Sequence, residues 1–215
     1  MASRGTPTAE RLPRGRHGLT RQEVAESQRD RMLLAMAEAV SEKGYVNTPV
    51  AEVLRRAGVS RETFYEHFAN KEECFLASYD AAASILLGAM AEGLGPSGGE
   101  TDLAKRLDAL LSSYFTVLSR DPSVARTFFV EVYAAGDAAL ARRVDVQRRF
   151  VDALADTVGA RTKEQRFACE ALVAAVSALV TQRVCAGRTE SLMELHAPVV
   201  RHMRTVLCGC GLLAA

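Results

Sequence analysis

The sequence has almost no net charge, and no stretch in it has the features of an export signal or a membrane span. Its 215 residues carry 27 Lys or Arg against 26 Asp or Glu, a formal net charge of +1. A chain so balanced has no general attraction for nucleic acid or an anionic membrane. Residues 1–19 lack an apolar signal-peptide core, and the longest uncharged apolar run, Ala171 to Thr181, is too short to cross a bilayer. We therefore expect a cytoplasmic protein with no membrane partner.

The chain lacks the even set of cysteines that a disulfide framework needs, since it has five. The five cysteines lie scattered in segments of helical pattern, as reduced thiols of an intracellular protein would. His196, His202, Cys208 and Cys210 are all metal-ligand types, but their spacing matches no structural zinc pattern. A catalytic cysteine would need a nearby base, which the sequence does not locate. We expect no cofactor, no metal and no enzymatic activity, with a metal or thiol sensor at these residues as an alternative.

Period-two alternation of apolar and polar residues is also missing, so the sequence predicts an all-α fold. It divides into a basic N-terminal arm over 1–19, a three-helix helix-turn-helix domain over 20–70 and a helical bundle domain over 71–215. About nine to ten helices are expected in all. The helical segments predicted in the third part are 71–93, 102–119, 122–135, 137–158, 163–186 and 190–207.

Capping residues mark where the first helices begin. Thr20 followed by Glu23 forms a capping box, in which each side chain bonds the backbone N–H of the other residue. Thr48 is the expected N-cap of a second helix whose first residue is Pro49, a position where the missing N–H costs nothing. Pro198 should kink the last predicted segment or open its main helix.

A short third helix over 61–68 follows the tight turn AGVS, with Ser60 as its N-cap. Phe64 and Phe68 can pack inward and hold this helix against the first two, which is helix-turn-helix geometry. Its other side chains point elsewhere and are chemically diverse: Arg61, Glu62, Thr63, Tyr65, Glu66 and His67. Such a set suits a recognition helix that meets base edges and phosphates in the major groove.

Individual side chains fit individual contacts to duplex DNA. Arg61 can bond the O6 and N7 atoms of guanine, Glu62 can accept from cytosine N4, and Thr63 can meet a thymine methyl group or a phosphate. Tyr65 and His67 can donate to phosphates, although packing in the core or capping are the plainer roles for these two residues. Two predicted helix N-termini, at Thr48 and at Lys71, are further positions that favour an anion such as a phosphate.

Residues 44–79, GYVNTPVAEVLRRAGVSRETFYEHFANKEECFLASY, resemble the N-terminal signature of the TetR family of bacterial transcription regulators. The resemblance implies a homodimer that binds a palindromic duplex operator, a variable C-terminal helical domain with an effector pocket, and dimerisation through the last two long helices. The basic arm is similar to arms that reach into the minor groove, although a solvated tail is the alternative. The residues expected to contact DNA are Thr48, Ser60, Arg61, Glu62, Thr63, Tyr65, His67 and Lys71, with Arg14 and Arg16 of the arm.

The C-terminal domain offers candidates for an effector pocket and for a dimer interface, with a plain intrachain core as the alternative for both. The expected effector-binding residues are Tyr114, Phe115, Arg126, Phe129, Tyr133, Gln147 and Phe150, which suit a small hydrophobic or aromatic molecule. The expected dimerisation residues are Phe167, Ala171, Ala175, Ala178, Leu179, Leu195, Val199 and Met203, several of them small enough for close helix approach.

The sequence therefore predicts a ligand-responsive DNA-binding transcriptional regulator, with repression of a palindromic operator as the expected mode. A small hydrophobic or aromatic effector is expected to release it. Two alternatives stay open. One is a ligand-independent activator or architectural DNA binder, and the other is the metal or thiol sensor named above.

Overall fold

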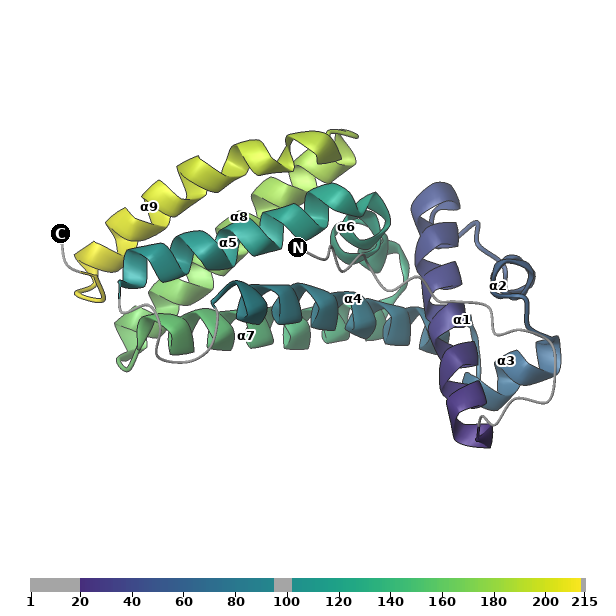
Figure 1. Ribbon diagram of the computed structural model, residues 1–215. Coiled ribbons are helices and arrows are strands. Elements are labelled where there is room, and N and C mark those ends of the chain that lie inside the picture. The colour runs from purple at the N-terminus through teal and green to yellow at the C-terminus, as the bar shows by residue number, and fades with distance from the viewer. Residues whose placement is uncertain (1–19, 95–101, 214–215) are drawn as a thin grey trace, which may run out of the picture. The chain divides into compact units, whose positions relative to one another are not determined.

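A computed structural model describes residues 20–94 and 102–213 of the chain (Figure 1). The described residues form nine α-helices and two short 3-10 helices, with no strand among them. The all-α prediction is confirmed. In chain order the elements are α1 (Arg21–Lys43), α2 (Val50–Ala57), α3 (Arg61–His67), α4 (Lys71–Gly93), α5 (Leu103–Arg120), α6 (Pro122–Phe129), η1 (Glu131–Ala134), α7 (Asp137–Val158), α8 (Lys163–Cys185), η2 (Thr189–Leu195) and α9 (His196–Gly209).

The chain divides into two compact units, residues 1–78 and 79–215. The boundary falls inside α4 and beyond the predicted boundary at residue 70. The physical reason is that the start of α4 belongs to the core of the first unit. Cys74 and Phe75 are fully buried there, and the Ser78 hydroxyl donates to the Leu33 carbonyl of α1 at 2.9 Å.

In the first unit, α1 begins at the predicted capping box. The Thr20 hydroxyl accepts from the Glu23 N–H at 3.2 Å, and a Glu23 carboxylate oxygen accepts from the Thr20 N–H at 2.6 Å. The second helix begins one residue later than predicted, because Pro49 is the N-cap and no side chain caps it. Apolar residues of all three helices and of α4 form the core of this unit. They include Met32, Met36, Val40, Val53, Phe64, Phe68 and Phe75.

In the second unit, two predicted helices are each divided. The segment 122–135 forms α6, with Pro122 as its first residue and Asp121 as its N-cap, followed by η1. The segment 190–207 forms η2 and then α9. Pro198 lies in the first turn of α9, where its missing N–H is tolerated, so the expectation that it opens the main helix is confirmed. Helix α5 packs on η2 and α9, and α8 packs on α6 and α7, as Figure 1 shows.

By length and composition alone, α4 and α8 could each cross a bilayer. Both helices bury residues against other parts of the fold, for example Leu86 of α4 and Val180 of α8. Core helices of soluble proteins pass the same test, so this property is weak evidence for a membrane span.

Candidate nucleic-acid interface and effector cavity

Helix α3 is fixed by its N-cap and by two buried aromatic rings. The Ser60 hydroxyl accepts a hydrogen bond from the Thr63 N–H at 3.0 Å. Gly58 ends α2 with φ at 64°, a left-handed conformation that glycine adopts without strain, and this makes the tight turn possible. Phe64 is 0% and Phe68 2% exposed, and their ring centroids lie 5.6 Å apart. A helix of only seven residues depends on such packing, because short helices are marginal alone.

The opposite side of α3 presents polar side chains to solvent. Its exposed residues are Arg61, Glu62, Tyr65 and Glu66, whereas Thr63 and His67 are half-buried. The Tyr65 side chain is 46% exposed, and the Arg61 guanidinium lies 5.8 Å from the centroid of its ring. N–H donors beside a phenol hydroxyl can bond base edges and phosphates. The fold thus brings the predicted recognition residues of this helix together, and their contact with DNA stays a prediction.

Thr48 has a different role from the one predicted. Its side chain is 0% exposed, and its hydroxyl donates to the carbonyl oxygens of Gly44 at 2.8 Å and Ala39 at 3.2 Å. Neither the helix cap nor the phosphate contact predicted for this side chain fits that position, because the hydroxyl is already bonded inside the domain. Thr48 instead ties the turn before α2 to the C-terminal end of α1.

The Lys71 ammonium group is half-buried at the start of α4. It donates to the Tyr45 carbonyl at 2.9 Å and lies 4.0 Å from the centroid of the Tyr45 ring. Burial lowers the pKa of Lys71. The group therefore holds the turn after α1 against α4, and its predicted phosphate contact would use an ammonium that already has a partner.

A cluster of charged side chains fastens α2 to α1. Glu52 lies within 3.0 Å of Lys43, Arg55 and Arg56, and Arg56 also pairs with Glu42 of α1 at 2.5 Å. Hydrogen bonds from Arg55, Arg56 and Lys43 hold the pKa of Glu52 well below its usual range. The pairs that join the two helices are Lys43 with Glu52 and Arg56 with Glu42, whereas Arg55 pairs with Glu52 of its own helix. Arg14 and Arg16 of the predicted arm lie outside the described residues.

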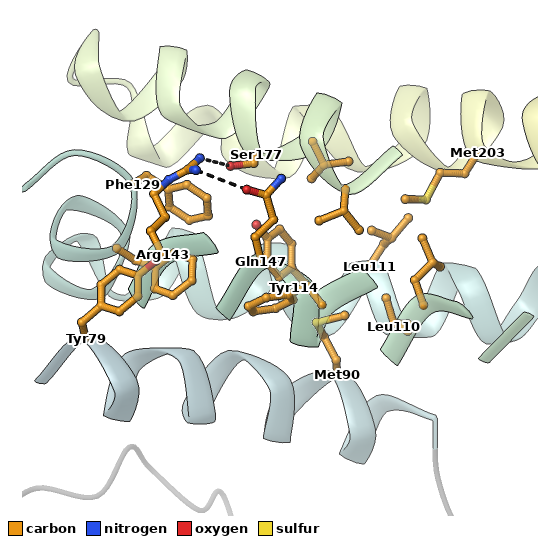
Figure 2. A pocket seen from close by; sticks show the side chains of 15 residues that line it. Tyr79, Met90, Leu110, Leu111, Tyr114, Phe129, Arg143, Gln147, Ser177 and Met203 are labelled. Atoms are coloured by element: carbon orange, nitrogen blue, oxygen red, sulfur yellow. Dashed lines mark hydrogen bonds between the residues drawn. The ribbon is translucent and has the colours of Figure 1, made fainter. Parts of the chain in front are cut away.

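The second unit contains a cavity lined by residues of α4 to α9, shown in Figure 2. Its volume is about 60 Å³, enough for a few water molecules at roughly 10–15 Å³ each. The lining residues are mostly aromatic and aliphatic: Tyr79, Met90, Leu110, Leu111, Tyr114, Phe128, Phe129, Arg143, Gln147, Phe150, Leu154, Val173, Val176, Ser177 and Met203.

Of the predicted effector residues, Tyr114, Phe129, Gln147 and Phe150 line this cavity. The other three do not, for distinct reasons. Phe115 is fully buried with its ring against His196, and Arg126 pairs with Glu131 at 3.0 Å. Tyr133 is 52% exposed, outside the cavity, and its ring carries the Arg143 guanidinium at 5.0 Å.

Three polar lining residues were missed by sequence reasoning. Tyr79 stacks on Phe128 with centroids 4.7 Å apart, and Arg143 donates to Gln147 Oε1 at 3.2 Å and Ser177 Oγ at 3.3 Å. Tyr79 is the last residue of the signature segment 44–79, which we interpreted in terms of DNA binding and not of an effector site. Ser177 lies among small residues read as a dimer face, and Arg143 is one of several arginines on its helix.

The comparison with known proteins concerns both units. The model of the family described as bacterial regulatory proteins, tetR family, matches residues 33–78, which hold the helix-turn-helix. This segment is a TetR-family helix-turn-helix domain. The chain as a whole has the fold of solved transcriptional regulators, one of them described as TetR-like, which cover more than four fifths of it.

Three individual relatives illustrate the likeness. The transcriptional activator FasR of Mycolicibacterium smegmatis is 26% identical over 133 residues, 62% of this chain and 59% of that protein. The chain thus spans about three fifths of this curated relative. FadR of Bacillus subtilis, solved with stearoyl-CoA, superposes with a TM-score of 0.70 at 18% identity, covering 81% of this chain and 96% of FadR. A transcriptional regulator from Rhodococcus sp. Rha1 superposes with a TM-score of 0.70 at 24% sequence identity, covering 84% of this chain and 96% of that protein's chain.

The predicted dimerisation residues divide into an exposed set on α8 and a buried set on η2 and α9. On α8, Phe167 is 68% and Leu179 40% exposed, and the small residues between them are exposed too: Ala171, Ala174, Ala175 and Ala178. At the end of η2 and on α9, the predicted contacts do not fit, because three side chains are buried within their own unit. These are Leu195, Val199 and Met203, each 6% exposed or less.

The cysteines and histidines that the structure describes do not gather into a metal site. Among the described residues, no group of three His, Cys, Asp or Glu side chains could hold a metal ion. Burial raises the pKa of Cys74 to about 12 and also raises that of Cys169, so both thiols are poor nucleophiles. His196 points to Asp108, with Nε2 and Oδ1 3.5 Å apart.

Proposed function

We propose that this TetR-family protein is a ligand-responsive transcriptional regulator that binds a palindromic operator as a homodimer. The observation that carries the proposal is the two-sided character of α3. Phe64 and Phe68 hold the helix from behind, while Arg61 and Tyr65 stand exposed in front. A rigid helix with donors on its free side is what groove recognition requires.

The exposed apolar stripe of α8 supports the homodimer. Phe167 and Leu179 are large apolar side chains left in solvent, and the alanines between them permit close approach of a second helix. Two recognition helices in one dimer would then meet successive major grooves about 34–36 Å apart. Palindromic symmetry in the operator would follow from twofold symmetry in the protein.

The cavity of the second unit supports control by a small, largely apolar ligand. Six helices contribute to its lining, which consists mainly of apolar side chains. The solved FadR of Bacillus subtilis carries stearoyl-CoA, so a protein of this fold can hold a long apolar ligand. The ligand acts by binding one conformation more tightly than the other, and a shift from 1:99 to 99:1 needs about 5.5 kcal/mol of differential affinity.

We propose that the protein represses transcription and that the ligand releases it from the operator. The alternative is activation, since the relative FasR is described as a transcriptional activator. A reporter gene placed behind the operator separates the two. Repression gives higher expression when the regulator is deleted, whereas activation gives lower expression.

The test of DNA binding is selection from a random duplex library with the purified full chain, followed by native mass spectrometry of the complex. We expect enrichment of a palindrome and a mass of two chains per duplex. A protein that enriches no sequence, or binds only as one chain, would contradict the proposal. Pairing Tyr65→Ala with Tyr133→Ala, a tyrosine of similar exposure in the other unit, controls for loss of aromatic surface.

A further inference from the structure

The cavity of the second unit has a polar end and an aliphatic end. In Figure 2, Arg143, Ser177 and Tyr79 lie toward one end, whereas Leu110 and Met203 lie toward the other. A ligand that fills such a space needs a polar head and an apolar tail. The cavity is only about 60 Å³, but two of its lining residues are Met90 and Met203. Methionine side chains are unbranched and adaptable, so they can move to admit a chain.

The polar end carries a positive charge with no carboxylate beside it. Arg143 is half-buried, and its bonds go to the neutral side chains of Gln147 and Ser177. Within residues 20–94 and 102–213, no Asp or Glu lies in ion-pair distance of it. The adjacent Arg142, in contrast, pairs with Asp80 at 3.2 Å. A guanidinium held by neutral partners keeps N–H donors that favour an anion.

The same end holds a hydroxyl without a partner. Tyr79 is 1% exposed, and its hydroxyl oxygen makes no hydrogen bond in the structure. A buried hydroxyl left unpaired costs free energy, and that cost is recovered when an acceptor arrives. Burial raises the pKa of Tyr79, so the hydroxyl keeps its proton and can donate it.

We propose that the effector is an aliphatic carboxylate, whose carboxylate group accepts hydrogen bonds from Arg143 and Tyr79 while its chain lies among Leu110, Leu111 and Met203. This inference rests on the proposed function, since it specifies the ligand of that regulator. It also separates this chain from a carrier of neutral apolar ligands, for which a half-buried guanidinium and an unpaired buried hydroxyl would be a penalty.

The test compares dodecanoate with methyl dodecanoate, which has the same chain without the charge. We expect calorimetric titration of the full chain to give an affinity for the acid about 10- to 100-fold higher than for the ester. The variant Arg143→Gln should abolish this preference and bind the ester as the parent does. Arg142→Gln, a substitution at the neighbouring paired arginine outside the cavity, should retain it.

Tyr79→Phe supplies a second readout that a purely structural role would not give. Because the hydroxyl has no partner in the free protein, its removal should leave the thermal midpoint unchanged or raise it. Binding of dodecanoate should nevertheless weaken, by about 2- to 10-fold. Tyr133→Phe, outside the cavity, should change neither quantity.

The inference is overturned if the ester binds as tightly as the acid, or if Arg143→Gln keeps the preference. Equal binding of dodecanoyl-CoA by the parent and by Arg143→Gln, with no binding of the free acid, would likewise overturn it in favour of a thioester. Operator binding measured on the same samples separates the two proposals. If DNA binding persists while the carboxylate fails to bind, only this inference falls, whereas loss of all DNA binding contradicts the proposed function itself.

Discussion

Replacement of Thr48 by valine distinguishes the structural role of this residue from contact with phosphate. Valine keeps the shape of the side chain and removes the hydroxyl that donates to Gly44 and Ala39. The hydroxyl is fully buried, so water cannot replace it as the donor. Loss of a buried hydrogen bond with its acceptors left unpaired costs about 1–3 kcal/mol. We expect the free energy of unfolding of the first unit to fall by that amount.

Urea unfolding followed by far-ultraviolet circular dichroism measures this change, because the chain has no tryptophan for fluorescence. Thr205→Val is the matched control, since the Thr205 hydroxyl also donates to a backbone carbonyl but is exposed on α9. It should change stability by less than about 0.5 kcal/mol. A phosphate contact would give a different result: Thr48→Val would unfold like the parent, and its operator affinity would fall. The slope of log affinity against log salt concentration would then drop by about 0.9, as expected for one lost phosphate contact. That outcome would contradict the structural role of Thr48.

Three further predictions concern charge and assembly. Arg55, Arg56 and Lys43 lower the pKa of Glu52 in the folded protein. Their interaction with Glu52 therefore stabilises the fold above the unfolded pKa of about 4.3, and this stabilisation is lost as pH falls toward the folded pKa. Glu52→Gln should remove that part of the acid sensitivity, as measured by urea unfolding at a series of pH values. Phe167→Glu should turn a dimer into a monomer of unchanged helical content in sedimentation analysis, and an intact dimer would exclude the α8 face. Deletion of residues 1–19 should weaken operator binding and flatten its salt dependence, and an unchanged slope would remove the arm from the interface.

Local signals in the sequence were sufficient for most of the helix boundaries. The capping box predicted at Thr20 and the cap predicted at Ser60 are both present in the structure. These signals work because they satisfy orphan N–H groups within four residues of the chain. Thr48 looked like one more cap, but its hydroxyl bonds to Gly44 and Ala39, carbonyls that precede it in the chain. Sequence pattern does not reveal that choice.

Tertiary packing decided what the sequence left open. Leu195, Val199 and Met203 recur at every fourth residue, a stripe that fits a dimer interface and an intrachain core equally well. Burial shows that they belong to the core of their own unit. Arg142 and Arg143 are neighbours in sequence, yet they point about 100° apart on the helix. Only the fold reveals that one pairs with Asp80 and the other lines the cavity.

The central claim is that α3 contacts the base edges of the operator. The most direct test measures the affinity of the parent and of Arg61→Ala for a selected operator and for its single-base substitutions. Arg55→Ala, at an exposed arginine of α2, is the control. We expect Arg61→Ala to lose about 1–3 kcal/mol of affinity and to stop discriminating at one symmetric pair of positions, while Arg55→Ala keeps the parent pattern. If Arg61→Ala discriminates at every position as the parent does, Arg61 does not read the operator.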